Sequence, residues 1–290
     1  MKFNSVAIFA NALSGSLNKA ELEKACEHIR KFIPTEIIYT HSLEEAKLKI
    51  QAIGSNGNVL LAACGGDGSI STLLNNINLS VPFGIIPQGT ANVVAVELGI
   101  PLDALNACKG LLAYAVKEID VAVCNGTRFL FTAGIGFDAV SADSVSKRLK
   151  KLFGRYAYYV STVLSFLKHV PTTLRVEADG KQVCEGEWFV ASNMRRYGGN
   201  LFFCPDARYD DGLLDAVVLK KLNLKSLMRL LCYAKGKRPF PKEEAVAIKA
   251  GKISVKANEP VLYQIDGEVY PPQCGFELFV QKEKARIIVP

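Results

Sequence analysis

The sequence predicts an α/β domain built on a parallel sheet, followed by a mostly β domain. Over about the first 115 residues, continuous apolar runs alternate with stretches of helical periodicity, which is typical of a parallel sheet covered by helices. After residue 117, short strand-like runs broken by turn residues dominate. We place the domains at residues 1–120 and 121–290, and we expect the last residues to pack back on the first domain.

Short apolar runs are the predicted strands of the first domain. They are residues 6–10, 36–39, 59–63 and 83–86. Helical periodicity covers residues 17–33 and 43–53, and further helices are expected to begin at Ser69, Thr90 and Leu102. Because these strands are apolar throughout, helices should cover both faces of the sheet. Ligands of such sheets bind at the carboxyl ends of the strands, so the loops there are the candidates for a site.

The second domain is predicted from shorter strands with hairpin turns between them. The strands are residues 118–123, 129–133, 173–178, 188–192, 214–219, 253–256, 262–265 and 276–281. Turn pairs such as Asp179-Gly180 and Asp266-Gly267 are typical of hairpins. Two helical stretches, residues 142–170 and 224–234, interrupt the strands.

Composition limits the classes to which the chain can belong. With 49% hydrophobic residues in a chain of 290, it is globular and large enough to bury its own core. The 8 cysteines and 3 histidines show no zinc spacing, so the cysteines indicate a reducing compartment. No apolar run reaches the ~18 residues that span a bilayer. We therefore expect a cytoplasmic protein.

Glycine-rich loops follow successive predicted strands of the first domain. The strand at 59–63 leads into Gly65-Gly66-Asp67-Gly68-Ser69, and the strand at 83–86 leads into Pro87-Gln88-Gly89-Thr90-Ala91-Asn92. Glycines at a strand-to-helix turn let backbone N–H groups approach a phosphate, and the helix N-terminus adds positive charge. The first loop by itself is equally compatible with a glycine turn capped by an aspartate. Rossmann and Walker-type phosphate-binding fingerprints are both absent from the sequence.

With these two loops the sequence resembles the diacylglycerol kinase catalytic domain, which bacterial diacylglycerol kinases share with sphingosine and ceramide kinases. The first loop also occurs in NAD kinases and phosphofructokinases. Further matches run through the second half of the chain. They are Gly134-Ile135-Gly136-Phe137-Asp138, Ala191-Ser192-Asn193 with Gly198-Gly199, Pro205-Asp206-Ala207, residues 210–215 and Asp266-Gly267-Glu268.

The resemblance implies an NAD kinase/diacylglycerol kinase-like fold. Residues 1–120 would form the ATP-binding kinase domain and residues 121–290 a β-sandwich domain for the lipid substrate, with the active site in the cleft between them. The implied reaction is an ATP- and Mg²⁺-dependent transfer of the γ-phosphate to the hydroxyl of diacylglycerol or a similar lipid. Such a transfer needs positioning and charge neutralisation more than covalent chemistry.

The resemblance also implies a role for individual residues. Glu268 would accept the proton of the lipid hydroxyl beside Asp266, and Asp67 would join a metal–water network at the phosphates. A separate, structural magnesium ion would be held by the Asp211 carboxylate and the carbonyls of Arg208 and Leu213. ATP would be contacted by Asn11, Ser14, Gly15, Thr40, Gly66, Asp67, Gly68, Ser69, Thr72, Gly89, Thr90 and Asn92.

One position departs from the family pattern in a way that affects chemistry. Many bacterial diacylglycerol kinases carry aspartate after the asparagine of the second loop, where this chain has Val93. The metal–water network would lose one carboxylate there. Taken without the family, Asp210-Asp211-Gly212 and Asp266-Gly267-Glu268 are also compatible with simple turns.

The basic segment at residues 147–155 and the aromatic and apolar stretch after it suit a peripheral contact with the inner face of the membrane, although core packing explains the apolar face equally well. The net charge of +7 does not indicate nucleic acid, because no recognition motif accompanies it. A homodimer is compatible with the sequence. Two other functions stay open: an NAD kinase-like enzyme with a soluble substrate, and a non-catalytic nucleotide- or lipid-binding regulator, which Val93 favours.

Overall fold

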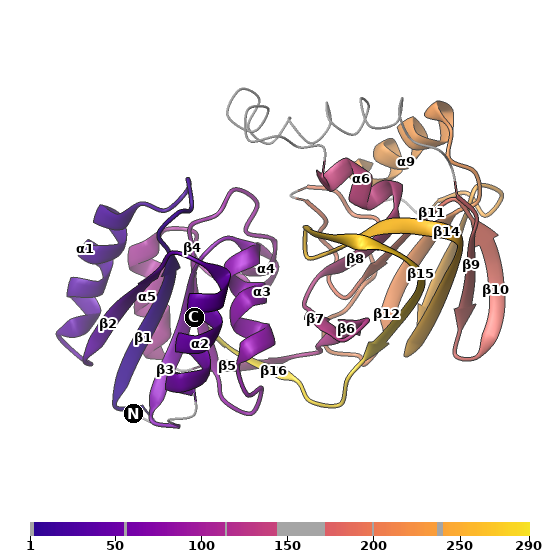
Figure 1. Ribbon diagram of the computed structural model, residues 1–290. Coiled ribbons are helices and arrows are strands. Elements are labelled where there is room, and N and C mark those ends of the chain that lie inside the picture. The colour runs from indigo at the N-terminus through magenta and orange to yellow at the C-terminus, as the bar shows by residue number, and fades with distance from the viewer. Residues whose placement is uncertain (1–2, 55–56, 114, 144–171, 199, 237–239) are drawn as a thin grey trace. The chain divides into compact units, whose positions relative to one another are not determined.

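The computed structural model describes residues 3–54, 57–113, 115–143, 172–198, 200–236 and 240–290 (Figure 1). The chain divides into two compact units. The first unit is Met1–Ile119 together with Lys282–Pro290, and the second unit is Asp120–Gln281. The basic segment 147–155, Gly199 and most of the helical stretch expected at 142–170 lie outside the described residues.

The described residues of the first unit form a six-stranded sheet in the order β2-β1-β3-β4-β16-β5. The bounds are β1 Ser5–Asn11, β2 Thr35–Thr40, β3 Val59–Gly65, β4 Phe83–Pro87, β5 Ala115–Ile119 and β16 Ala285–Val289. Strands β1 to β4 and β16 are parallel, and β5 runs antiparallel to β16. The last strand of the chain therefore completes the first sheet.

Helices connect the strands of this sheet. Their bounds are α1 Lys19–Arg30, α2 Leu43–Gly54, α3 Asp67–Asn76, α4 Val93–Leu98 and α5 Ala104–Ala113. The predicted α/β class with a parallel sheet is confirmed, and β3 is buried almost throughout, as a strand covered on both faces must be. Helix α4 begins three residues later than expected, because Asn92 adopts a left-handed conformation (φ 48°) and its side chain bonds back to Gly89.

The second unit contains a ten-stranded antiparallel sheet within the described residues. Its strands are β6 Ala122–Cys124, β7 Thr127–Phe129, β8 Thr132–Gly136, β9 Leu174–Ala178, β10 Lys181–Gly186, β11 Trp188–Ser192, β12 Leu214–Leu219, β13 Ala245–Ala250, β14 Lys252–Ile265 and β15 Glu268–Val280. The stretches predicted as separate strands at 253–256 and 262–265 form the single strand β14, which pairs with β9 through its first half and with β8 through its second. Register irregularities between Lys256 and Tyr263 accompany this change of partner.

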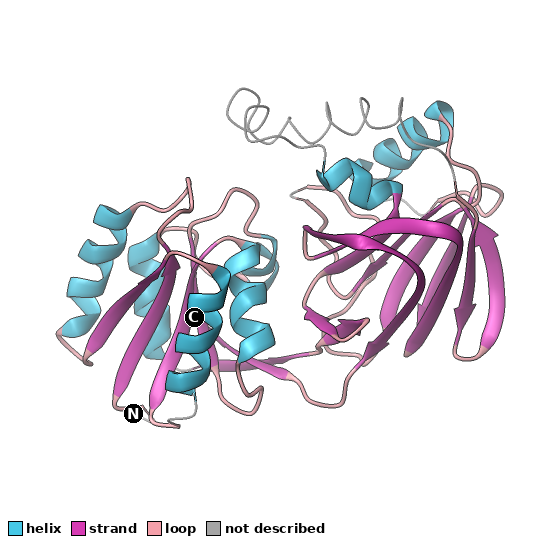
Figure 2. Cartoon of the chain, in the orientation of Figure 1, coloured by secondary structure: helices cyan, strands magenta, loops and turns pink. Residues whose placement is uncertain are grey.

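Helices α6 Phe137–Asp143 and α9 Leu224–Gly236 cover part of this sheet (Figure 2). A cluster of buried side chains that includes Trp188, Phe203 and Leu227 joins α9 to β11 and β12. The larger core of the unit consists of side chains from the strands themselves. None of the described helices is both long and apolar enough to cross a membrane.

Candidate functional site

The two glycine-rich loops of the first unit lie against each other at the carboxyl ends of β3 and β4. The Gln88 N–H donates to the Gly65 carbonyl (2.9 Å). A side chain on Gly89 would collide with the Cα atom of Gly66, so the two backbones approach as closely as only glycine allows. Gly65 itself has a φ of 151°, a conformation that L side chains rarely adopt. The predicted juxtaposition of two phosphate-binding loops thus has a packing basis.

Asp67 connects these loops through its carboxylate. Its Oδ2 atom accepts from the Val93 N–H (3.1 Å), and its Oδ1 atom accepts from the Val94 N–H (3.2 Å). These N–H groups open α4 and have no partner within the helix. Burial raises the pKa of Asp67, while backbone hydrogen bonds act in the opposite direction. Both oxygens of the Asp67 carboxylate therefore bind the N-terminus of α4 and hold that helix next to the first glycine-rich loop.

The N-terminus of α3 is the part of these loops best suited to an anion. Among the described residues, no side-chain hydrogen bond caps this helix at Gly66, while the Ser69 N–H donates to the Gly66 carbonyl (2.9 Å). A helix N-terminus without a side-chain cap suits an anion. The Thr72 hydroxyl donates to the Gly68 carbonyl (2.9 Å). Of the residues predicted to bind ATP, Gly66, Gly68 and Ser69 lie in this loop, and Gly89, Thr90 and Asn92 lie in the neighbouring one.

The loop after β1 joins the same edge of the sheet. Thr40 is the register partner of Asn11, and the Thr40 carbonyl accepts from the Ala12 N–H (2.9 Å). The Asn11 side chain accepts from the Leu13 N–H (2.9 Å) and so shapes the loop that carries Ser14 and Gly15. The Gln88 side chain accepts from the Asn18 N–H (2.9 Å). Hydrogen bonds thereby connect the second glycine-rich loop with the segment that follows β1.

In the second unit, Asp266 anchors the turn between β14 and β15. Its carboxylate accepts three backbone N–H groups at 2.9–3.0 Å, from Leu130, Phe131 and Thr132, and the residue is 6% exposed. Asp266 has a left-handed φ of 48°. Glu268, two residues later, is exposed at the start of β15. The two acids predicted to act together thus differ: one fixes the backbone, and the other points its carboxylate toward solvent.

The predicted metal ligands lie in the loop before β12. Asp211 Oδ1 accepts from the Leu213 N–H (3.1 Å), and Asp211 Oδ2 lies 2.9 Å from the Lys249 ammonium. One carboxylate with two backbone carbonyls is the kind of oxygen donor set that suits Mg²⁺. The residues therefore fit the ion, provided that Lys249 releases Oδ2. Within the described residues there is no group of three or more His, Cys, Asp and Glu side chains that could hold a metal, so any site here depends on carbonyls.

The sequence analysis did not predict several buried polar residues of the second unit as parts of the site. Asp120 is 1% exposed and accepts from the Gly212 N–H (2.6 Å), and Asn193 is fully buried and donates to the carbonyls of Asp120 and Leu130. Asp138 is 5% exposed and bonds to two side chains from distant segments. Asn193 and Asp138 both lie in motifs that the resemblance singled out, so the motifs were the available signal. Their partners could not be read from the sequence.

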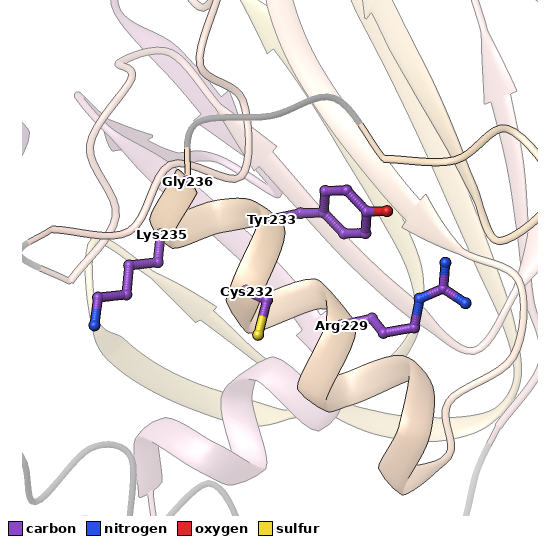
Figure 3. Close-up of a pocket in the computed structure, with 5 residues that line it drawn as sticks. All are labelled: Arg229, Cys232, Tyr233, Lys235 and Gly236. Carbon is purple, nitrogen blue, oxygen red and sulfur yellow. The ribbon is translucent and has the colours of Figure 1, made fainter.

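A hollow of about 580 Å³ lies along α9 (Figure 3). Its lining consists of Arg229, Cys232, Tyr233, Lys235 and Gly236. Arg229 forms an ion pair with Glu244. The hollow is basic and open, and none of the predicted ATP, metal or catalytic residues lines it.

Comparison with known proteins places both units in one family. Residues 5–124 match the diacylglycerol kinase catalytic domain, and residues 132–277 match the YegS C-terminal NAD kinase beta sandwich-like domain. The diacylglycerol kinase of Bacillus subtilis is 31% identical over 235 residues, which cover 79% of this chain and 75% of that protein. The diacylglycerol kinase of Staphylococcus aureus is 29% identical over 270 residues, covering 90% and 85%.

Solved structures share the fold. A diacylglycerol kinase from Bacillus anthracis superposes with a TM-score of 0.77 at 23% identity and covers 100% of this chain and 98% of its own. An NAD kinase from Archaeoglobus fulgidus, solved in complex with ATP, superposes with a TM-score of 0.51 at 12% identity, covering 98% and 92%. The predicted fold class and the family resemblance are both confirmed: the chain belongs to the bacterial diacylglycerol kinase family.

Proposed function

We propose that this protein is an ATP- and Mg²⁺-dependent lipid kinase that transfers the γ-phosphate of ATP to the hydroxyl of diacylglycerol or a similar lipid. The observation that carries the proposal is the pair of glycine-rich loops in contact at the carboxyl ends of β3 and β4, within a chain 31% identical to a diacylglycerol kinase. Kinase family membership supports the use of ATP.

Each acid of the proposed site then has a distinct task. The α3 N-terminus and the loop N–H groups would bind phosphate oxygens, and Asp67 would hold the second loop at the correct distance. Glu268 would accept the proton of the lipid hydroxyl, while Asp266 keeps its turn in place. Asp211 and the carbonyls of Arg208 and Leu213 would hold a structural Mg²⁺ in the loop before β12.

The experiment that tests this proposal is transfer of labelled γ-phosphate from ATP to a panel of lipid alcohols in mixed micelles, with NAD included as a soluble acceptor. We expect label on a lipid, loss of that label in Asp67→Asn, and normal labelling in Glu259→Gln, an exposed acid on β14. Label on NAD alone would establish the NAD kinase-like alternative. No label on any acceptor, with ATP still bound, would establish the regulator.

We also propose that the protein reaches its substrate at an anionic membrane surface. Helix α9 contains no acidic residue, its Leu224 and Met228 side chains are 51% and 49% exposed, and five other residues of the same helix line the basic hollow of Figure 3. Met228→Glu should weaken sedimentation with phosphatidylglycerol vesicles. Leu48→Glu is the matched control, because Leu48 is 68% exposed but its neighbours Lys47 and Lys49 are already paired with glutamates. Equal binding of both variants and the native protein would contradict the proposal.

A further inference from the structure

A chain of hydrogen bonds connects a buried acid on α6 to the turn that carries Glu268. The Tyr197 hydroxyl donates to Asp138 Oδ1 (2.7 Å), and Gln264 Nε2 donates to Asp138 Oδ2 (2.8 Å). Gln264 Oε1 in turn accepts from the Gly267 N–H (2.8 Å). Gly267 is the residue immediately before Glu268. Three segments that are distant in sequence therefore meet at one carboxylate.

The structure makes room for this carboxylate. A side chain on Gly134 of β8 would collide with the Asp138 carboxylate, so the glycine of the motif is needed where it stands. Asp138 is 5% exposed and Gln264 is 1% exposed, and such buried polar groups are stable only with partners. Both oxygens of Asp138 face donors, so only the ionised acid accepts both bonds without rearrangement. The hydrogen bonds thus run in a defined direction, from the donors to the Asp138 carboxylate.

The turn itself depends on two separate anchors. Asp266 binds it to the backbone of Leu130, Phe131 and Thr132, which sets the position of the turn. Gly267 has a φ of 84° and is held through its N–H by Gln264. The hydrogen bond from the Gly267 N–H fixes the peptide plane between Asp266 and Gly267. Because this plane sets the direction in which the chain enters Glu268, the second anchor controls the direction of the Glu268 side chain.

We propose that Asp138 is a positioning residue for phosphoryl transfer, acting through Gln264 and the Gly267 N–H to orient the Glu268 carboxylate. The proposal rests on the proposed function of Glu268. A misplacement of about 1 Å at a reacting group can cost on the order of 100-fold in rate. We therefore expect Asp138→Ala to lower kcat about 10- to 100-fold and to leave the KM for ATP unchanged, because the residues predicted to bind ATP are in the first unit.

The decisive variant inverts the hydrogen bonds without changing the total charge. In Asp138→Ala the Gln264 amide nitrogen loses its acceptor, and the link is broken. In the double variant Asp138→Asn/Gln264→Glu, the new asparagine accepts from Tyr197 and donates to the new glutamate, which still accepts from Gly267. We expect this double variant to recover kcat to within about fivefold of the native protein, the factor that corresponds to about 1 kcal/mol for one hydrogen bond. Failure to recover would overturn the proposal.

Two further readouts separate positioning from a general structural effect. First, Asp138→Ala should add little to the loss already caused by Glu268→Gln, because both changes act on the same group. Additive losses would overturn the proposal. Second, the Gly267 amide should exchange with deuterium faster in Asp138→Ala and at the native rate in the double variant. Unchanged exchange in Asp138→Ala would overturn the proposed link itself.

The exchange measurement does not depend on catalysis, so it tests the link even if the native protein phosphorylates no lipid. In that event the proposed function fails while the link is judged separately. Should Asp138→Ala not fold, Gln264→Asn takes its place, since it keeps the acid and shortens the bridge by one methylene. It should also speed Gly267 exchange and lower kcat. Tyr197→Phe should have the smaller effect, because it leaves the bond from Gln264 to Gly267 in place.

Discussion

Each unit uses an aspartate, partly buried in the first unit and buried in the second, for the same purpose but over very different distances in the chain. Asp67 holds the next loop of the first unit, 26 and 27 residues ahead, whereas Asp266 holds residues 134 to 136 positions earlier. Both carboxylates are occupied by backbone N–H groups. Of the acids predicted to be catalytic, only Glu268 is exposed. The comparison teaches that motif aspartates can build the site while a neighbouring glutamate acts in it.

The largest effect on this difference between structural and reacting acids is expected from removing the exposed acid. Glu268→Gln should lower the single-turnover rate about 10²- to 10⁴-fold, the usual contribution of general-base catalysis. ATP affinity and the free energy of unfolding should stay near the native values, because the Glu268 side chain is exposed. Rapid-quench measurement of labelled lipid tests this, with Glu259→Gln as control. An unchanged single-turnover rate would remove Glu268 as the base.

Removal of Asp266 or Asp67 should instead lower the free energy of unfolding, because both carboxylates hold backbone N–H groups. Asp266→Ala leaves three buried N–H groups without their acceptor and Asp67→Ala leaves two, each at a cost of about 1–3 kcal/mol. We therefore expect Asp266→Ala to lower the free energy of unfolding more than Asp67→Ala. Urea denaturation measures both. Asp179→Ala is the control for the left-handed backbone, because Asp179 has a φ of 47° in an exposed turn. A cost for Asp266→Ala no larger than that control would contradict its role as an anchor.

Asp138 adds a buried acid whose ionisation can be followed. Burial is the largest cause that raises its pKa, to about 6, and the hydrogen bonds from Tyr197 and Gln264 act against it. Because the pKa of Asp138 is raised in the folded state, this residue adds on the order of 3 kcal/mol to the free energy of unfolding below pH ~4. That contribution is lost as the pH rises through about 6. Activity should change in the reverse sense, because only the ionised acid accepts both bonds.

Urea denaturation and kcat between pH 4 and 7 test this opposition. In Asp138→Asn the unfolding free energy should lose the part of its slope between pH 4 and 6 that the native protein shows. If the native protein and the variant have parallel stability profiles, the raised pKa is wrong.

The smallest expected effect concerns the predicted metal. The Lys249 ammonium holds Asp211 Oδ2 and lies 3.4 Å from Asp215 Oδ2, so Mg²⁺ must displace it. Lys249→Met should therefore tighten Mg²⁺ binding, by about tenfold or less for a pair that is partly exposed. Isothermal titration of Mg²⁺ measures this directly. Weaker binding in Lys249→Met would show that the ion does not use this carboxylate.

The sequence by itself determined strands β1 to β4 of the first unit and the loops that follow them, whereas β5 and β16 were not predicted as strands of this sheet. There, buried strands read as continuous apolar runs, and glycine loops follow them at the ends where the sheet topology brings loops together. Much of the second unit could not be predicted in the same way. β10 and β13 have mixed polarity and were not predicted, and β14 was expected as two strands because its middle residues interrupt the apolar pattern.

Only the tertiary structure decided which acids are free to react. The residues at Asp67, Asp266 and Glu268 are carboxylic acids in motifs, and a motif does not say where its side chains find partners. The partners of Asp67 and Asp266 are backbone N–H groups, and Asp138 has a glutamine of β14 as a partner. The contacts of Asp266 and Asp138 span more than a hundred residues, and such contacts leave no local periodicity in the sequence. Chain folding brings Asp138 to Gln264, because buried polar groups must be paired wherever the strands place them, and it also brings the partly exposed Lys249 to Asp211.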